Sequence, residues 1–272
     1  MCERVALDLL AARRLGRGLL AGSDLAVLVL LGIGGRVVVG HVVSFSSGSG
    51  DRYLPGVRTP KRVATETKAG NDRGVTRPLL VAALGDSITA GTPFWDPDPE
   101  IRATIGPELD ERHQWGYWAE RAYPGIRMRN HGVNGERTDQ IAARLDEAIE
   151  GADVLIVQGG INDIAQGRPL ERALANLADM LERGRAAGLA VALANLLPWN
   201  NGFPAKDPLI RELNAGIAAL AAARSVELLD FFATLEDPER PGTMPDQWTS
   251  EGDHPSLDGY RRLGELAFRL PS

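Results

Sequence analysis

The sequence predicts an α/β protein, in which a five-stranded parallel sheet carries helices on both faces. From Pro78 onward, short apolar runs alternate with amphipathic helical patterns. Helical connections between such runs favour right-handed crossovers, which bring successive strands into one parallel sheet. Ligands of such sheets bind beyond the carboxyl ends of the strands. The turns that follow the strands are therefore where function is expected.

Each expected strand is a short, near-continuous apolar run, which is typical of strands buried on both faces. Because strands of a parallel sheet need crossover connections, a helical pattern is expected between consecutive runs. The five runs are Leu79–Leu84, Ile126–Asn130, Val154–Gly159, Ala190–Leu196 and Val226–Asp230.

Four expected helices show apolar residues at helical spacing. The first begins at a capping Thr138, the third covers Asp207–Ala223, and the last follows Pro255-Ser256. The inward residues are, in chain order, Ile141, Leu145, Ala148 and Ile149; Leu170, Leu174, Leu177 and Leu181; Leu209, Leu213, Ile217 and Leu220; and Leu263, Leu266 and Ala267.

Charge separates the chain into a basic first part and an acidic body. Residues 1–77 hold 12 Lys and Arg against 6 Asp and Glu, or +6, whereas the remainder holds 18 against 30, or −12. An acidic body repels phosphate backbones, so no nucleic-acid partner is expected. The single cysteine, Cys2, excludes an intrachain disulfide, and the four histidines are too scattered to predict a metal site.

Residues 1–77 are expected to be an extension outside the catalytic fold, which residues 78–272 would form. Their apolar run, Leu25 to Gly35, is shorter than the roughly 20 residues that cross a bilayer, and residues 44–77 are polar and rich in Gly and Ser. A weak membrane or export signal, an ordered accessory element and a start codon placed too far upstream all remain open. Membrane contact is expected only through residues 1–43, and the location of the protein stays open, with the cytoplasm slightly favoured.

Four polar stretches follow the strands or precede the last helix. The first strand ends in Gly85-Asp86-Ser87, the second in NHGVNGERT (130–138), and the third in QGGINDIAQG (158–167). The last helix is introduced by SEGDHPS (250–256). A serine, two glycine-rich polar turns and a late histidine are the parts of a serine hydrolase, since a serine hydroxyl needs a base to become nucleophilic.

Other motifs fail at the first of these stretches. A phosphate-binding loop requires a lysine a few residues after its first glycine, and the residues directly after Gly85 include none. The nucleophile elbow G-x-S-x-G requires glycine where Thr89 stands, and G-x-G-x-x-G is missing.

Together the four stretches resemble the sequence blocks of the SGNH hydrolases, also called GDSL-type esterases and lipases, from about Leu79 to Phe268. The resemblance implies a three-layer flavodoxin-like sandwich and catalysis without a cofactor. It also implies that Ser87 is the nucleophile and donates one backbone amide to the oxyanion hole. Gly135 would supply a second amide, Asn162 a side-chain donor, and His254 the base.

The acid departs from the family pattern, which places an aspartate three residues before the histidine. Here that position is Glu251, and Asp253 offers a second carboxylate next to His254. An offset of three brings side chains to the same side, whereas adjacent side chains usually diverge. Glu251 is therefore favoured as the group that orients His254, with Asp253 or a backbone carbonyl as the alternatives.

Several polar residues have competing interpretations. His131 is a rival base, although a structural role is favoured for it, and Asp86 and Asp163 are expected to be hydrogen-bonding scaffold. Aromatic residues in Thr92–Trp118 and Leu197–Pro208 are expected either to rim the site or to pack long loops.

The resemblance predicts a serine esterase that acts on a small-molecule carboxylic ester, with short acyl groups such as acetyl favoured. The alternatives with the same residues are a thioesterase, a lysophospholipase and a carbohydrate O-deacetylase. A non-catalytic binding module that has kept the fold is the alternative from another class. The oligomeric state stays open.

Overall fold

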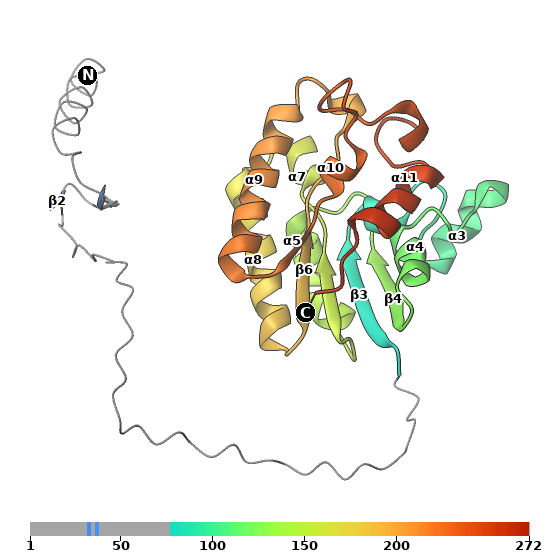
Figure 1. Ribbon diagram of the computed structural model, residues 1–272, viewed down its shortest axis with the longest axis horizontal. Coiled ribbons are helices and arrows are strands. Elements are labelled where there is room, and N and C mark those ends of the chain that lie inside the picture. Colours follow the sequence, from blue (N-terminus) through green and yellow to red (C-terminus); the bar gives the residue numbers. More distant parts are fainter. Residues whose placement is uncertain (1–31, 34–35, 38–76, 272) are drawn as a thin grey trace, which may run out of the picture. The chain divides into compact units, whose positions relative to one another are not determined.

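The computed structural model describes residues 32–33, 36–37 and 77–271 (Figure 1). In the first of these parts, β1 (Gly32–Ile33) and β2 (Arg36–Val37) pair antiparallel. Most of the apolar run predicted in the extension lies outside the described residues. None of the helices that the structure describes combines the length and the apolar character needed to cross a membrane.

Residues 77–271 contain a sheet of five parallel strands in the order β4-β3-β5-β6-β7, which confirms the predicted fold class (Figure 1). β5, β6 and β7 end one or two residues sooner than predicted, whereas β3 and β4 continue one and two residues further. The strands are β3 (Leu79–Gly85), β4 (Ile126–Gly132), β5 (Val154–Val157), β6 (Ala190–Ala194) and β7 (Glu227–Leu229).

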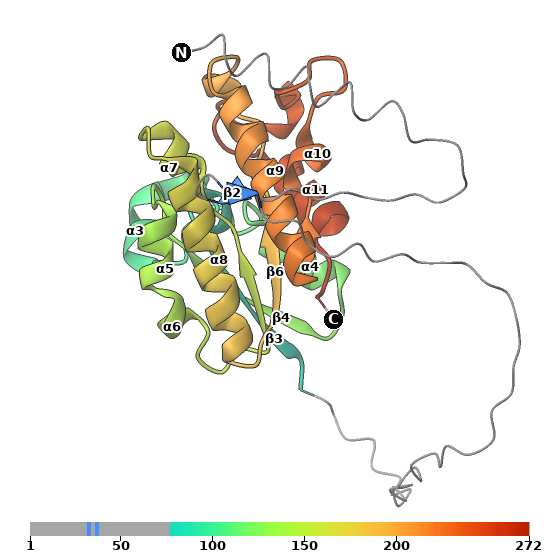
Figure 2. The ribbon, with the colours of Figure 1, turned by 90° about the vertical axis from the view of Figure 1, so that its left-hand side faces the viewer.

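Helices cover both faces of this sheet, so the molecule has three layers here (Figures 1 and 2). One face packs against α5 (Thr138–Ala143), α6 (Leu145–Ala148), α8 (Leu170–Ala186) and α9 (Asp207–Arg224). The other packs against α4 (Trp115–Ala122), α10 (Phe231–Leu235), α11 (Leu257–Arg262) and a π-helical turn η4 (Leu263–Ala267). Shorter helices are α2 (Ser87–Ala90), α3 (Pro99–Ile105), η1 (Gly106–Glu108), α7 (Ile161–Ala165), η2 (Asn200–Gly202) and η3 (Asp246–Trp248).

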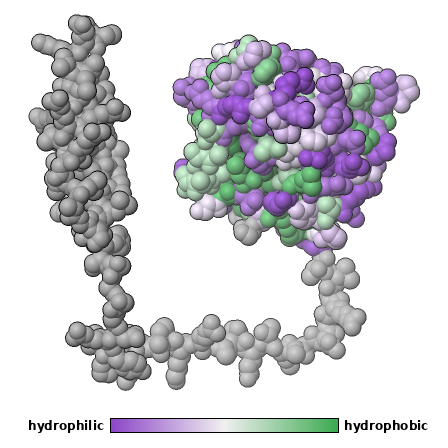
Figure 3. All heavy atoms as spheres, turned by 45° about the horizontal axis from the view of Figure 1, so that its top comes forward, coloured by the Kyte–Doolittle hydropathy of each residue, from purple (hydrophilic) through white to green (hydrophobic). Residues whose placement is uncertain are grey.

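The two buried clusters follow the alternation of the central strand. Ala82 and Leu84 face the α8 side, whereas Val81 and Ala83 face the α4 side, because successive side chains of a strand point to opposite faces. Large hydrophobic side chains that stay exposed come from separate elements, and the face drawn in Figure 3 mixes hydrophilic and hydrophobic residues.

Three details of the predicted helices are wrong. Arg137, rather than Thr138, is the N-cap of α5, and the chain breaks at Arg144 into α5 and α6. Leu266 is 49% exposed instead of facing inward, while Leu263 and Ala267 are buried as predicted. The last turn is π-helical, and its wider i→i+5 spacing rotates Leu266 away from the core.

A glycine allows β4 to end directly against α2. A Cβ atom on Gly132 would lie 2.0 Å from the amide nitrogen of Ala90, which no other residue type could accommodate. Asn130 fixes this approach, since its Nδ2 donates to the Ala90 carbonyl at 3.1 Å and its Oδ1 accepts from the Gly132 amide at 2.9 Å. The carboxyl ends of β3 and β4 and the helix that begins at Ser87 are therefore held together.

Candidate active site

Ser87 is the first residue of α2, directly after the central strand β3. Asp86 caps this helix, because its side chain accepts a hydrogen bond from the Ile88 amide at 3.0 Å. The serine is 6% exposed. The strand-to-helix turn thus holds its hydroxyl at the carboxyl edge of the sheet.

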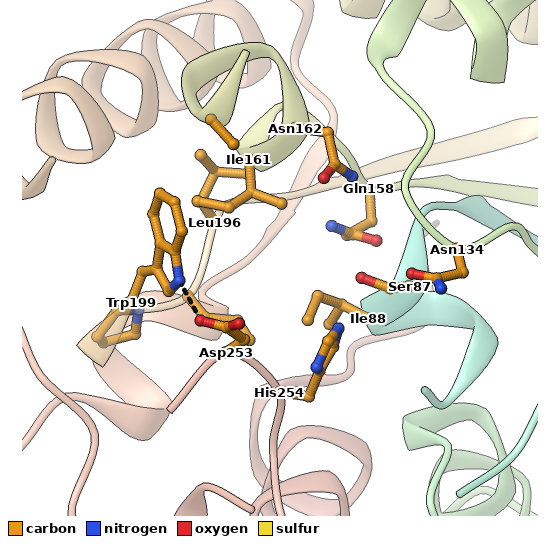
Figure 4. Close-up of a pocket in the computed structure, with 13 residues that line it drawn as sticks. Ser87, Ile88, Asn134, Gln158, Ile161, Asn162, Leu196, Trp199, Asp253 and His254 are labelled. Atoms are coloured by element: carbon orange, nitrogen blue, oxygen red, sulfur yellow. Dashed lines mark hydrogen bonds between the residues drawn. The ribbon is translucent and has the colours of Figure 1, made fainter. Parts of the chain in front are cut away.

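Ser87 and His254 line one cavity of about 150 Å³ (Figure 4). Its wall combines polar side chains near the serine with an apolar side toward Trp199. The further lining residues are Ile88, Asn134, Gln158, Ile161, Asn162, Ala165, Leu196, Leu197, Pro198, Trp199 and Asp253.

The two carboxylates beside the histidine have different partners. Oε1 of Glu251 contacts Nδ1 of His254. Oδ1 of Asp253 instead accepts hydrogen bonds from Trp199 Nε1 at 2.5 Å and from Asn201 Nδ2 at 2.8 Å. Of the two carboxylates, Glu251 is therefore the one in contact with the imidazole.

Nδ1 of His254 is occupied by this contact, which leaves its Nε2 for the cavity. Ser87 and His254 have no direct hydrogen bond within the described part of the chain, although Figure 4 shows both at the same side of the cavity. Hydrogen bonds of this kind are often long in unliganded sites and shorten when substrate binds.

Backbone and side-chain bonds fix the loop that carries His254. Oγ1 of Thr249 accepts from the Gly252 amide at 2.9 Å and donates to the His254 carbonyl at 2.9 Å. Nδ2 of Asn201 also donates to the Glu251 carbonyl at 3.0 Å. Gly252 has a φ of +95°, which favours glycine. The histidine thus lies on a tight turn that several hydrogen bonds hold in place.

The residues predicted for the oxyanion hole lie at adjacent turns. Asn162 lines the cavity, and its Nδ2 donates to the Glu136 carbonyl at 2.9 Å. Gly135, with a φ of +79°, occupies the turn that includes Glu136, and its neighbour Asn134 lines the cavity. The structure therefore brings Ser87 and Asn162 to the cavity, with Gly135 next to its wall.

Buried scaffold bonds support both turns. Asp163 accepts from the Thr138 amide at 2.9 Å and from its hydroxyl at 3.0 Å, which agrees with the predicted scaffold role. Arg144 pairs with Glu136 at 2.7 Å and donates to the Gly85 carbonyl at 3.3 Å. Sequence reasoning missed Arg144, because a break inside a helical pattern leaves no local signal.

The carboxyl of Asp86, which caps α2, is fully buried. Burial raises the pKa of its carboxyl from 3.8 to about 6, although hydrogen bonds with the Ile88 amide and with Gln158 oppose this shift. Within the described residues, Oδ2 of Asp86 has no hydrogen-bond partner. The pKa of this carboxyl therefore makes stability depend on pH.

We expect the free energy of unfolding to fall as pH rises from 4 to 6, relative to an Asp86→Asn variant. In this window the folded protein keeps a proton that the unfolded chain has released, so rising pH favours unfolding by up to about 3 kcal/mol. Asparagine still caps α2 but does not titrate. Urea unfolding of both proteins at pH 4, 5, 6 and 7 measures this difference, and a constant difference contradicts it.

The rival base does not reach the cavity. His131 lies on the edge strand β4 and is not among the cavity-lining residues. Burial, together with the charges of Arg129 and Arg144, lowers the pKa of its imidazole. The favoured structural role for this histidine agrees with its position.

Most of the aromatic residues of the insert pack rather than rim the site. Trp115 is buried against Phe231 and Phe268, with ring centroids 5.7 and 6.2 Å away. None of the three tryptophans in Thr92–Trp118 lines the cavity, whereas Trp199 does. The tryptophans of the insert 92–118 therefore lie away from the cavity, as expected if they pack the long loop. Trp199, in the loop after β6, lies at the cavity, as expected for a residue at the rim of the site.

Sequence reasoning assigned no role to Gln158, although this residue directly follows β5 and lines the cavity. Its position after a strand end is the local signal that points to it. Among the described residues, no group of three or more His, Cys, Asp or Glu side chains is placed to hold a metal ion.

Three solved structures illustrate the likeness of this fold to known proteins. A G-D-S-L family protein from Desulfitobacterium hafniense DCB-2 is 23% identical, with a TM-score of 0.56 over 68% of this chain and 95% of that chain. A GDSL-like lipase from Bacteroides thetaiotaomicron is 24% identical, with a TM-score of 0.52 over 69% and 84%. A lipolytic G-D-S-L family protein from Veillonella parvula is 19% identical, with a TM-score of 0.56 over 68% and 94%. At these identities the likeness concerns the fold.

A serine and a histidine at the carboxyl edge of a parallel α/β sheet are typical of serine hydrolases. The family model described as GDSL-like lipase/acylhydrolase matches residues 83–262. This chain belongs to that family and is therefore a hydrolase of ester bonds, as the resemblance to the SGNH hydrolases predicted. Among curated proteins, none matches this chain.

Proposed function

We propose that this protein is a serine esterase that hydrolyses short-chain carboxylic esters through an acyl-enzyme on Ser87. His254 is the general base and Glu251 orients it. Gly135 and Asn162 donate to the oxyanion. The observation that carries this proposal is the shared cavity of Ser87 and His254, together with the Glu251 carboxylate on Nδ1 of the imidazole.

In the first half of the reaction, Nε2 of His254 takes the proton of the Ser87 hydroxyl while Oγ attacks the ester carbonyl carbon. The carbonyl oxygen becomes an oxyanion, which accepts from the amides of Ser87 and Gly135 and from Nδ2 of Asn162. The intermediate collapses, and the imidazolium gives its proton to the leaving alcohol.

In the second half, His254 takes a proton from water, and the hydroxide attacks the acyl group on Ser87. The oxyanion donors act again on the second intermediate. The proton returns to Oγ of Ser87 as the carboxylic acid leaves, so the enzyme is regenerated. Every proton moves through His254, and the cycle requires no cofactor.

The size and lining of the cavity support short acyl groups. A cavity of about 150 Å³ holds a ring of benzene's size, or roughly six carbon atoms. Ile161, Leu196 and Trp199 make its far side apolar, which suits an acyl chain.

We expect kcat/KM for 4-nitrophenyl esters to be highest at or below hexanoate and to fall at octanoate, because the longer chain exceeds the cavity. The measurement compares acetate through octanoate. Acyl thioesters and a lysophospholipid are parallel substrates that test the alternatives with the same residues. An optimum at octanoate contradicts the short-acyl specificity, and an inert protein contradicts the esterase and favours a binding module.

We also propose that residues 78–272 form the hydrolase domain and that residues 1–77 are an extension outside it. The family match to residues 83–262 supports this division. A chain that begins at Asp72 keeps the Arg77–Asp153 ion pair and is expected to retain its kcat/KM, which a loss of activity would contradict.

Membrane contact is proposed only through residues 1–43. Cell fractionation of the full chain and of a chain without these residues tests it. Contact predicts a membrane-bound fraction that disappears on deletion, and two identical distributions contradict it.

A further inference from the structure

Gln158 presents a hydrogen-bond donor to the cavity beside Ser87. Its side chain is almost fully buried, since the residue is 2% exposed, and it lines the cavity at the end of β5. Its Oε1 accepts from Oγ1 of Thr89 at 2.9 Å and from the Asp86 amide at 3.3 Å. A backbone N–H can only donate, so the atom that faces it is the oxygen. Nε2 consequently points into the cavity, as Figure 4 shows.

The oxygen of this side chain accepts two hydrogen bonds, and one hydrogen of Nε2 is directed at the Asp86 carboxyl, whose pKa it lowers. An amide nitrogen carries two hydrogens, so the second is left for the cavity. Leaving a buried donor without an acceptor costs about 1–3 kcal/mol. An occupant that displaces water from the cavity therefore binds better when it carries an acceptor for Nε2.

The position of Gln158 indicates which part of an ester would carry that acceptor, an argument that rests on the proposed function. The leaving alcohol takes its proton from His254, so it lies on the His254 side of Ser87. Figure 4 shows Gln158 and Asn162 on the other side of Ser87. The oxyanion has three lone pairs, and Ser87, Gly135 and Asn162 already supply three donors. The acceptor for Gln158 therefore belongs to the acyl group.

We propose that Gln158 is a specificity-determining residue, whose Nε2 donates a hydrogen bond to an oxygen atom on the acyl chain. The site then selects short acyl groups that carry an ether, hydroxyl or keto oxygen near the ester carbonyl over plain alkanoyl groups. A plain alkyl chain of the same size fills the cavity but leaves the buried donor unpaired.

Two isosteric ester pairs isolate this hydrogen bond. 4-Nitrophenyl methoxyacetate and butanoate differ only in one chain atom, oxygen or methylene, and so do 3-methoxypropanoate and pentanoate. The ether preference is kcat/KM of the ether ester divided by kcat/KM of the alkyl ester. This ratio is divided by the same ratio of the hydroxide-catalysed rate constants, which removes the difference in intrinsic reactivity. In wild-type protein we expect a preference of about tenfold or more for the ether in at least one pair.

Two variants separate specificity from structure. Gln158→Met removes both donor and acceptor at similar size, whereas Gln158→Glu keeps an acceptor for Asp86 and Thr89 but presents a carboxylate oxygen to the cavity at pH 8. Both are expected to lose the ether preference. Gln158→Glu also places a second carboxylate beside Asp86, so circular dichroism of each variant establishes that it is folded before its two rates are compared. Ile161→Val changes the cavity wall without touching a donor and should keep the preference.

Three results overturn the proposal. Wild-type protein without an ether preference is the first. The second is an ether preference that persists in Gln158→Glu. The third is a Gln158→Met variant in which kcat/KM falls equally for both esters of a pair, because a purely structural role lowers both rates alike. In these cases hydrolysis of the butanoate ester leaves the esterase function standing. A wild-type protein inert on all four esters overturns the specificity and the proposed function together.

Discussion

Ser87→Ala is expected to lower kcat for 4-nitrophenyl butanoate by roughly 10⁴-fold or more. The variant removes the nucleophile, so no acyl-enzyme can form, while the strand-to-helix turn and its Asp86 cap stay in place. Initial rates of wild type and variant at saturating ester measure the effect.

The same chemical change at Ser250 is the matched control. Its hydroxyl contacts Glu251 in the loop of His254, so Ser250→Ala perturbs the site without removing a nucleophile, and a much smaller loss is expected. A fluorophosphonate should label Ser87 in wild type and in Ser250→Ala but should not label Ser87→Ala, and peptide mapping identifies the labelled residue. Undiminished turnover in Ser87→Ala would rule out the acyl-enzyme.

Glu251→Gln is expected to lower kcat by about 10²–10⁴-fold, whereas Asp253→Asn should change it far less. Each substitution replaces a carboxylate by an amide of the same size, and the two positions flank the same loop. Only Glu251 contacts Nδ1 of His254, where it holds the imidazole orientation and stabilises the imidazolium. Stopped-flow or steady-state rates of the two variants decide between them.

Asp253→Asn has its own expected signature, which is lower stability. Its carboxylate accepts two hydrogen bonds, from Trp199 and Asn201, and weakening them costs about 1–3 kcal/mol. Thermal unfolding of the same two variants measures this cost. Equal losses of kcat in both variants, or a larger loss in Asp253→Asn, would assign the orienting role to the wrong residue.

The fold could be predicted from the sequence because each element carries its own periodicity. The buried run of Leu79–Gly85 and the leucine stripe of α8 need no knowledge of their neighbours to be recognised. The break at Arg144 and the π-helical turn that exposes Leu266 could not be predicted, since each depends on contacts with distant segments.

The candidate site divides in the same way. Motif order predicts Ser87, Asn162 and His254, and the offset of three favours Glu251 over Asp253. The structure adds what sequence distance hides. Trp199 reaches Asp253 across 54 positions, and the orientation of the Gln158 amide depends on Asp86 and Thr89. Neither fact can be obtained from spacing along the chain.

The bond between Trp199 and Asp253 has a consequence for altering this protein by design. Trp199 shapes the apolar end of the cavity, and through Asp253 it is tied to the loop that carries His254. A smaller side chain at Trp199 therefore enlarges the cavity and also removes one of the two hydrogen bonds that Asp253 accepts, while Asn201 and Thr249 still hold the loop. Under the proposed function, a broader substrate range obtained at Trp199 comes with a less constrained His254 loop, and a second substitution that gives Asp253 a new donor restores the constraint.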